Sequence, residues 1–161
     1  MLQMWNSNKR DTTANWKQVT KIHGRPTFLQ LKKLEKELTT NAAKVQSDLG
    51  GGAHGHLGML KSPADYALIS QTPYTLPVQP PPLTIPAGAT QAATFTLQQQ
   101  HQLETDKFKE TMEVRKALGH QLLEAIDSEY MNEFLDDYTH LINQPLHQVL
   151  ETLFRRYGKV R

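Results

Sequence analysis

The stretch Leu146-His147-Gln148-Val149-Leu150-Glu151-Thr152-Leu153-Phe154-Arg155-Arg156-Tyr157 decides the fold class of this chain. Its apolar residues recur at steps of three and four, and they are Leu146, Val149, Leu150, Leu153 and Tyr157. This spacing places them on one side of an α-helix, whereas Glu151, Thr152 and Arg155 fall largely on the other side. An isolated helix of about four turns is marginal in water. The stretch therefore predicts a helix that packs, either within the chain or against another copy.

Further apolar stripes precede this one along the chain. The first runs from Phe28 to Leu49 and ends at Gly50, Pro63 after a Ser62 cap starts a short helix, and two more stripes follow Gly88. Their members are Val114, Ala117, Leu118, Leu122, Ala125 and Ile126, and then Tyr130, Phe134, Tyr138 and Leu141 or Ile142. Amphipathic helices bury such stripes by packing on one another. The sequence predicts a mainly α protein, a helical bundle.

The stretch Gly50-Gly51-Gly52-Ala53-His54-Gly55-His56-Leu57-Gly58 interrupts the helical pattern. A phosphate-binding loop needs a lysine followed by Ser or Thr at its end, and Lys61-Ser62 comes too late. His54 and His56 could bind a metal ion, although a structural site normally needs four ligands. We favour a turn in which glycines take positive backbone angles and the histidines form hydrogen bonds.

A proline-rich tract without charge follows. There is no Asp, Glu, Lys or Arg from Tyr66 to Gln102, and six of the nine prolines lie between Pro73 and Pro86. Proline fixes its own backbone angle and lacks an amide donor, so we expect an extended connector over residues 73–89. An alternative function is a ligand for a proline-reading domain, through Pro77-x-x-Pro80, although the basic flank of such ligands is missing.

Charge is unevenly distributed, although the net formal charge is only +2. Residues 1–25 are basic and lack helical periodicity, which predicts a mobile arm. Candidate RNA-binding residues there are Lys9, Arg10, Lys17, Lys21 and Arg25, with Trp16 able to stack on bases. A solvated tail with no ligand explains the same residues.

The chain of 161 residues contains no cysteine, which excludes disulfides and a thiol nucleophile within it. We expect one domain or two small ones, divided into an arm (1–25), a helical and glycine-turn segment (26–72), the connector (73–89) and a helical bundle segment (90–161). No apolar run approaches the ~18 residues of a membrane span, so we expect a cytoplasmic protein without membrane contact. No catalytic set and no cofactor site is predicted.

Several motifs resemble Gag-like polyproteins of Copia-type LTR retrotransposons, in particular the versions found in diatoms and related algae. They are Gly24-x-Pro26-Thr27, Leu38-x-x-Asn41-Ala42, Leu49 to Gly58, Ser62-Pro63-Ala64-x-Tyr66, Ile85-Pro86-Ala87-Gly88-Ala89-Thr90 and Ala125-Ile126-x-x-Glu129-Tyr130. In addition, Leu150-x-x-Leu153-Phe154-x-x-Tyr157-Gly158 is similar to the helical signature that closes the first capsid lobe of that group. The resemblance spans residues 22 to 160.

The resemblance implies a non-enzymatic, capsid-like protein that assembles into particles around the RNA of the element. Such polyproteins continue into a second lobe and often a cysteine-containing zinc knuckle, whereas this chain stops at Arg161 without a cysteine. The resemblance thus implies the N-terminal part of Gag, as a truncated copy. The hypotheses are self-association through the stripe from Leu146 to Tyr157 with sequence-indifferent RNA contact, a proline-presenting adaptor, or a metal-dependent site at His54 and His56.

Overall fold

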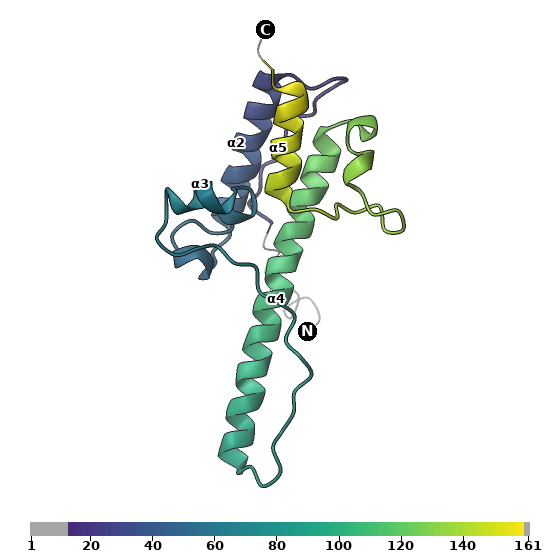
Figure 1. Cartoon of the computed structure of the whole chain (residues 1–161). Coiled ribbons are helices and arrows are strands. Elements are labelled where there is room, and N and C mark those ends of the chain that lie inside the picture. Colours follow the sequence, from purple (N-terminus) through teal and green to yellow (C-terminus); the bar gives the residue numbers. More distant parts are fainter. Residues whose placement is uncertain (1–12, 160–161) are drawn as a thin grey trace. The chain divides into compact units, whose positions relative to one another are not determined.

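A computed structural model describes residues 13–159 and shows a mainly α-helical protein (Figure 1). The described α-helices are α2 (Phe28–Lys44), α3 (Pro63–Ala67), α4 (Gln91–Ala125) and α5 (Leu146–Tyr157). Four short 3-10 helices join them: η1 (Leu49–Gly51), η2 (Leu57–Met59), η3 (Ser128–Tyr130) and η4 (Asn132–Phe134). Over these residues β-structure is limited to two isolated bridges, Ile22 with Ile126 and Leu135 with Ile142. The predicted fold class, mainly α, is confirmed.

The chain divides into two compact units. Unit 1 contains the described residues 13–75 and 114–159, and unit 2 contains Leu76–Glu113. The division falls inside α4, so the first turns of this helix group with the proline-rich connector. No helix within the described range is long and apolar enough to cross a membrane.

A capping box starts α2. The Thr27 hydroxyl accepts a hydrogen bond from the Gln30 amide at 3.3 Å, and the Gln30 side chain accepts one from the Thr27 amide at 3.0 Å. These bonds satisfy two amides near the start of the helix. The helix ends at Lys44, earlier than the predicted end at Leu49, because Val45 already has an extended backbone.

The core of unit 1 joins three helical stripes that were predicted from the sequence. Its helical members are Leu31, Leu34, Leu38 and Ala42 from α2, Val114, Leu118, Leu122 and Ala125 from α4, Ile126 just after it, and Leu146, Val149, Leu150 and Leu153 from α5. α2 and α5 lie side by side (Figure 1), and Phe28 meets Phe154 edge to face at 5.9 Å between ring centroids. Each stripe thus covers the apolar face of another.

Residues 13–25 pack against this core instead of forming the predicted mobile arm. Val19 and Ile22 are buried, and the Ile22 amide donates to the Ala125 carbonyl at 2.7 Å. Two apolar residues three positions apart show no recognisable period, which is why the sequence did not indicate this packing. Residues 1–12 of the predicted arm lie outside the described residues.

A buried amide holds the same segment in place. The Asn41 side chain accepts a hydrogen bond from the Lys17 amide at 3.1 Å and donates one to the Lys17 carbonyl at 2.8 Å. Asn41 also donates to Gln121 of α4 at 3.2 Å. Because a buried amide requires partners, this network specifies where the backbone of the segment runs.

The segment between α4 and α5 is not the regular helix that Tyr130, Phe134 and Tyr138 predicted. Two 3-10 helices are followed by a turn, in which Asp136 Oδ1 accepts from the amides of Tyr138 (2.9 Å) and Thr139 (3.0 Å). These amide contacts lower the pKa of the Asp136 carboxyl. An aspartate that bonds neighbouring amides offers the backbone an alternative to helix, so Phe134 is buried while Tyr138 is 93% exposed.

Candidate functional site

The glycine-rich stretch forms the turn that the sequence predicted. Gly50, Gly51, Gly52 and Gly55 all have positive φ angles. At Gly55 (φ +56°) a Cβ atom would lie 2.5 Å from the Val45 carbonyl oxygen, so only glycine fits beside the end of α2. The turn is therefore a tight structural element that brings its two histidines beside a later part of the chain.

Both histidines bond to residues that are distant in the sequence. His54 Nε2 donates to the Ile69 carbonyl at 3.2 Å, and His56 Nδ1 lies 2.7 Å from the Tyr74 hydroxyl. Across residues 13–159, no group of three or more His, Asp or Glu side chains is arranged to hold a metal ion. The hydrogen bonds of His54 and His56 tie the turn to residues 69–74.

Burial keeps the centre of this turn uncharged. It lowers the pKa of His56, against the opposing effect of nearby Asp48, and it raises the pKa of Tyr74, with Tyr66 adding to the rise. The Tyr66 hydroxyl donates to the Gly50 carbonyl at 2.7 Å, and its ring meets that of Tyr74 at 5.9 Å. His56 is only 2% exposed, and the hydrogen bonds of this cluster hold the turn against Tyr66 and Tyr74.

Of the basic candidate RNA-binding residues, the structure describes Lys17, Lys21 and Arg25. Lys21 forms an ion pair with Asp127 at 3.8 Å, and the Arg25 guanidinium lies over the Tyr157 ring, 5.0 Å from its centroid. Lys17 is exposed. Lys9 and Arg10 lie outside the described residues. The structure thus gives Lys21 and Arg25 contacts inside unit 1.

Trp16 lines a shallow hollow of about 330 Å³ in unit 1, together with Gln18, His120 and Gln121. The ring is half-buried, and its Nε1 is a buried donor for which the described part of the chain provides no acceptor. Trp16 also packs against the core of unit 1. Trp16 therefore combines a packing role with an accessible aromatic surface.

The stripe on α5 lies in the core. Leu146, Val149, Leu150 and Leu153 are all buried, and Leu153 is 0% exposed. Tyr157 is half-buried and meets Tyr130 edge to face at 5.5 Å. The sequence left two roles open for this stripe, packing within the chain and contact with another subunit. The burial supports packing within the chain, because a fully buried leucine has no surface left for another subunit.

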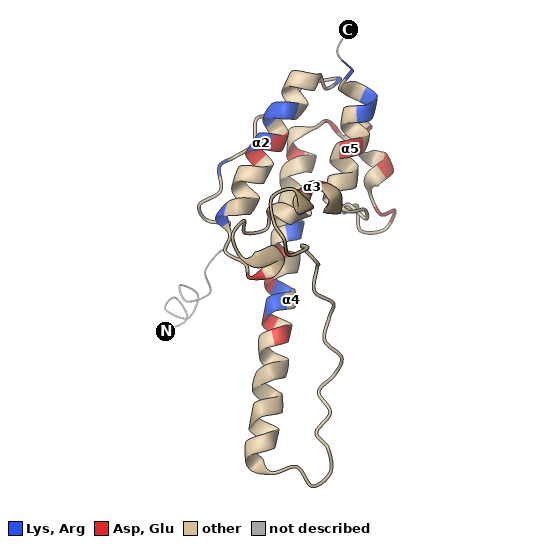
Figure 2. Ribbon diagram, turned by 60° about the vertical axis from the view of Figure 1, so that its left-hand side comes forward, with Lys and Arg blue, Asp and Glu red and all other residues tan. Residues whose placement is uncertain are grey.

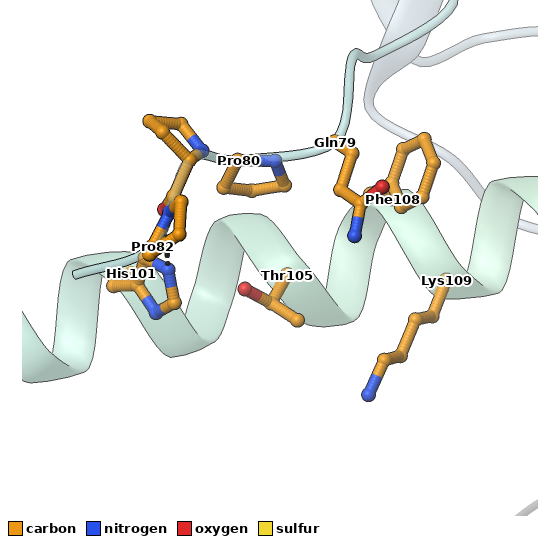
Figure 3. Close-up of a pocket in the computed structure, with 8 residues that line it drawn as sticks. Gln79, Pro80, Pro82, His101, Thr105, Phe108 and Lys109 are labelled. Atoms are coloured by element: carbon orange, nitrogen blue, oxygen red, sulfur yellow. Dashed lines mark hydrogen bonds between the residues drawn. The ribbon is translucent and has the colours of Figure 1, made fainter.

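An open groove of about 640 Å³ lies within unit 2, between the connector and α4 (Figure 3). Pro80 and Pro82 line it from the connector, and Thr105 and Phe108 line it from the helix. His101 Nε2 donates to the Pro81 carbonyl at 2.9 Å, which fastens the connector along the helix. Pro77 and Pro80 form the predicted ligand motif for a proline-reading domain, and each is half-buried.

Among the described residues, large exposed apolar side chains are concentrated in unit 2, a feature that was not predicted from the sequence. Those of large size are Leu76, Val78, Leu83, Ile85, Phe95, Leu97 and Leu103. Figure 2 shows the connector and the first turns of α4 without charged residues, in agreement with the uncharged sequence from Leu76 to Leu103. This lack of charge was visible in the sequence, where it was interpreted as a property of a connector or of a ligand for a proline-reading domain.

Comparison of the chain with protein-family models, with curated proteins and with solved structures finds no match.

Proposed function

We propose that this chain is a non-enzymatic structural protein that self-associates, as its resemblance to Gag-like proteins implies. One observation carries the proposal: unit 2 exposes seven large apolar side chains on a segment that has no charge from Leu76 to Leu103. Contiguous exposed apolar surface on a soluble protein commonly marks an interaction site. Unit 1, by contrast, buries its stripes and supplies a stable scaffold.

Sedimentation velocity or light scattering over a range of concentrations tests self-association of the full chain. We expect the average mass to rise with concentration. Because apolar contacts are not screened, the rise should persist at about 1 M salt, where the Debye length is about 3 Å. A chain that stays monomeric at every concentration would overturn the proposal, and association that disappears in salt would point to charge contacts instead.

RNA contact forms a secondary part of the proposal, supported by exposed Lys17 beside the partly accessible ring of Trp16. Phosphate contacts release counterions, so binding of a single-stranded RNA should weaken steeply with salt and show no base preference. Lys17→Ala should weaken binding, whereas Lys33→Ala, an exposed lysine on α2, serves as the matched control. Equal effects of the two variants would contradict a role for the surface at Trp16.

A further inference from the structure

A stripe of exposed side chains runs along one side of the first turns of α4. Phe95, Gln99 and Leu103 follow one another at steps of four, and Phe95 and Leu103 are 59% and 61% exposed. Residues three or four apart lie on the same side of a helix, so exposed Asp106 and Glu110 continue this stripe toward the helix C-terminus. The stripe is thus apolar and neutral in its first part and acidic in its second part.

The connector of unit 2 covers a different side of the same helix. His101, Thr105 and Phe108, which line the groove beneath the prolines (Figure 3), are half-buried and fall on nearly the opposite side of α4 from Gln99. The connector therefore leaves the stripe uncovered.

We infer that the stripe pairs with the same stripe of a second copy of the chain, with the two helices antiparallel and Gln99 at the two-fold axis. The inference rests on the proposed self-association and names the surface that performs it. Phe95 and Leu103 each lie four residues, or about 6 Å, from Gln99. In the antiparallel pair Phe95 of one copy therefore faces Leu103 of the other, and the contact is self-complementary.

The charges of the stripe favour a second copy in this orientation. A parallel pair would place Asp106 opposite Asp106 and Glu110 opposite Glu110, and like charges in contact repel each other. The antiparallel pair instead places Asp106 opposite uncharged Ala92. A strongly charged partner gains nothing from the uncharged part of the stripe at Phe95, Gln99 and Leu103, whereas a second copy presents the same apolar and neutral side chains to it.

The size of the stripe determines the strength of the contact. Two large apolar side chains per copy are fewer than the roughly 20–30 residues that each side contributes to a standard stable interface. Pairing is therefore expected to depend on concentration. A single charge placed at Phe95 or Leu103 should be sufficient to prevent it.

Disulfide formation tests the pairing directly, because the chain has no native cysteine. Helices that pack at about 8–10 Å, with Cα atoms about 2.3 Å from each axis, bring facing Cα atoms to roughly 3.4–5.4 Å, and the upper part of this range suits a disulfide. Under mild oxidation of the full chain we expect Gln99→Cys to form covalent dimers. Leu97→Cys, on another side of the same helix, is the matched control and should remain monomeric.

The two flanking positions distinguish the orientations. In the antiparallel pair, Phe95→Cys alone and Leu103→Cys alone place their sulfurs about 12 Å apart along the axis and should not form dimers, whereas a mixture of the two variants should. In a parallel pair each variant would link to itself, and that result would overturn the inference. Circular dichroism should show unchanged helicity, because every altered side chain is exposed.

Phe95→Glu separates this inference from the proposed function. If the native chain associates and Phe95→Glu is monomeric, the stripe is the contact. If both associate equally and Gln99→Cys forms no dimer, the stripe is overturned while self-association stands. If the native chain itself is monomeric at all concentrations, both the inference and the proposed function fail.

Discussion

The two units of this protein use apolar helix positions in opposite ways. In unit 1, α2, α5 and the last turns of α4 turn their stripes toward one another, and Leu153 is 0% exposed. In unit 2, the first turns of α4 keep Phe95 and Leu103 in solvent. Both behaviours occur on one helix, Gln91–Ala125. Helical spacing of apolar residues therefore predicts burial only where the fold supplies a second apolar stripe that packs against them.

The chemistry of the connector explains why unit 2 has no such second stripe. Proline lacks an amide donor and fixes its backbone angle, so the connector remains extended and cannot form a helix over α4. It covers the side of His101 and Phe108 and leaves the other side open. Unit 1 thus contains the buried helical core, and unit 2 keeps Phe95 and Leu103 exposed.

The largest effect is expected when the core of unit 1 is truncated. Leu153→Ala should lower the free energy of unfolding by about 2–5 kcal/mol, because it removes a fully buried side chain and leaves a cavity. Urea unfolding followed by circular dichroism measures the change. Leu29→Ala, an exposed leucine on α2, is the matched control and should stay within about 0.5 kcal/mol. Equal losses in both variants would contradict the assigned core.

The glycine turns of the two units give the next comparison. Gly55→Ala in unit 1 forces a Cβ against the Val45 and Ala43 carbonyls and also places alanine at φ +56°. Gly88→Ala in unit 2 meets nothing within 4 Å and carries only the backbone cost of about 1–2 kcal/mol. We expect Gly55→Ala to reduce the melting temperature more. A larger loss from Gly88→Ala would show that the turn at Gly55 is not closely packed against α2.

The sequence predicted those parts of the fold that depend on local periodicity and capping. The stripes on α2, α4 and α5 and the Ser62 cap of α3 lie where spacing and residue type placed them. The segment 13–25 was missed because its packing depends on a distant amide, Asn41, that no local pattern reveals. The segment after α4 was assigned to helix because Tyr130 and Phe134 have helical spacing, while the turn at Asp136 overrides it.

The candidate site was less accessible to sequence reasoning. The glycine turn followed from composition, but the partners of His54 and His56 lie 15 and 18 residues away and could not be inferred from spacing. The exposed stripe at Phe95 and Leu103 has the spacing of a buried one, and only the absence of a covering helix distinguishes the two.

Acid should destabilise unit 1 through His56. Burial lowers the pKa of this residue, so between its folded pKa and the unfolded value of about 6.5 the unfolded chain binds more protons. Stability is therefore retained above about pH 6.5 and lost as the pH falls through the folded pKa. Of the neighbouring groups, Asp48 opposes the shift, and burial raises the pKa of Tyr74.

Between pH 8 and pH 5, a range that spans the unperturbed histidine pKa of about 6.5, the melting temperature should therefore fall less steeply in His56→Gln than in the native chain. His54→Gln keeps the buried ring of His56 and should retain the native pH dependence. Parallel curves for the native chain and His56→Gln would show that other groups cause the acid loss.

The smallest effect is expected in unit 2. Leu103→Ala removes the same atoms as Leu153→Ala, but from a side chain that is 61% exposed, so the free energy of unfolding should change by about 0.5 kcal/mol or less. The measurement must be made at a concentration where the chain is monomeric, since association would add stability to the native protein. Under these conditions a loss above about 1 kcal/mol would mean that Leu103 is packed within the monomer. The contrast between the two units would then fail at this position, because α4 would bury its stripe along its whole length.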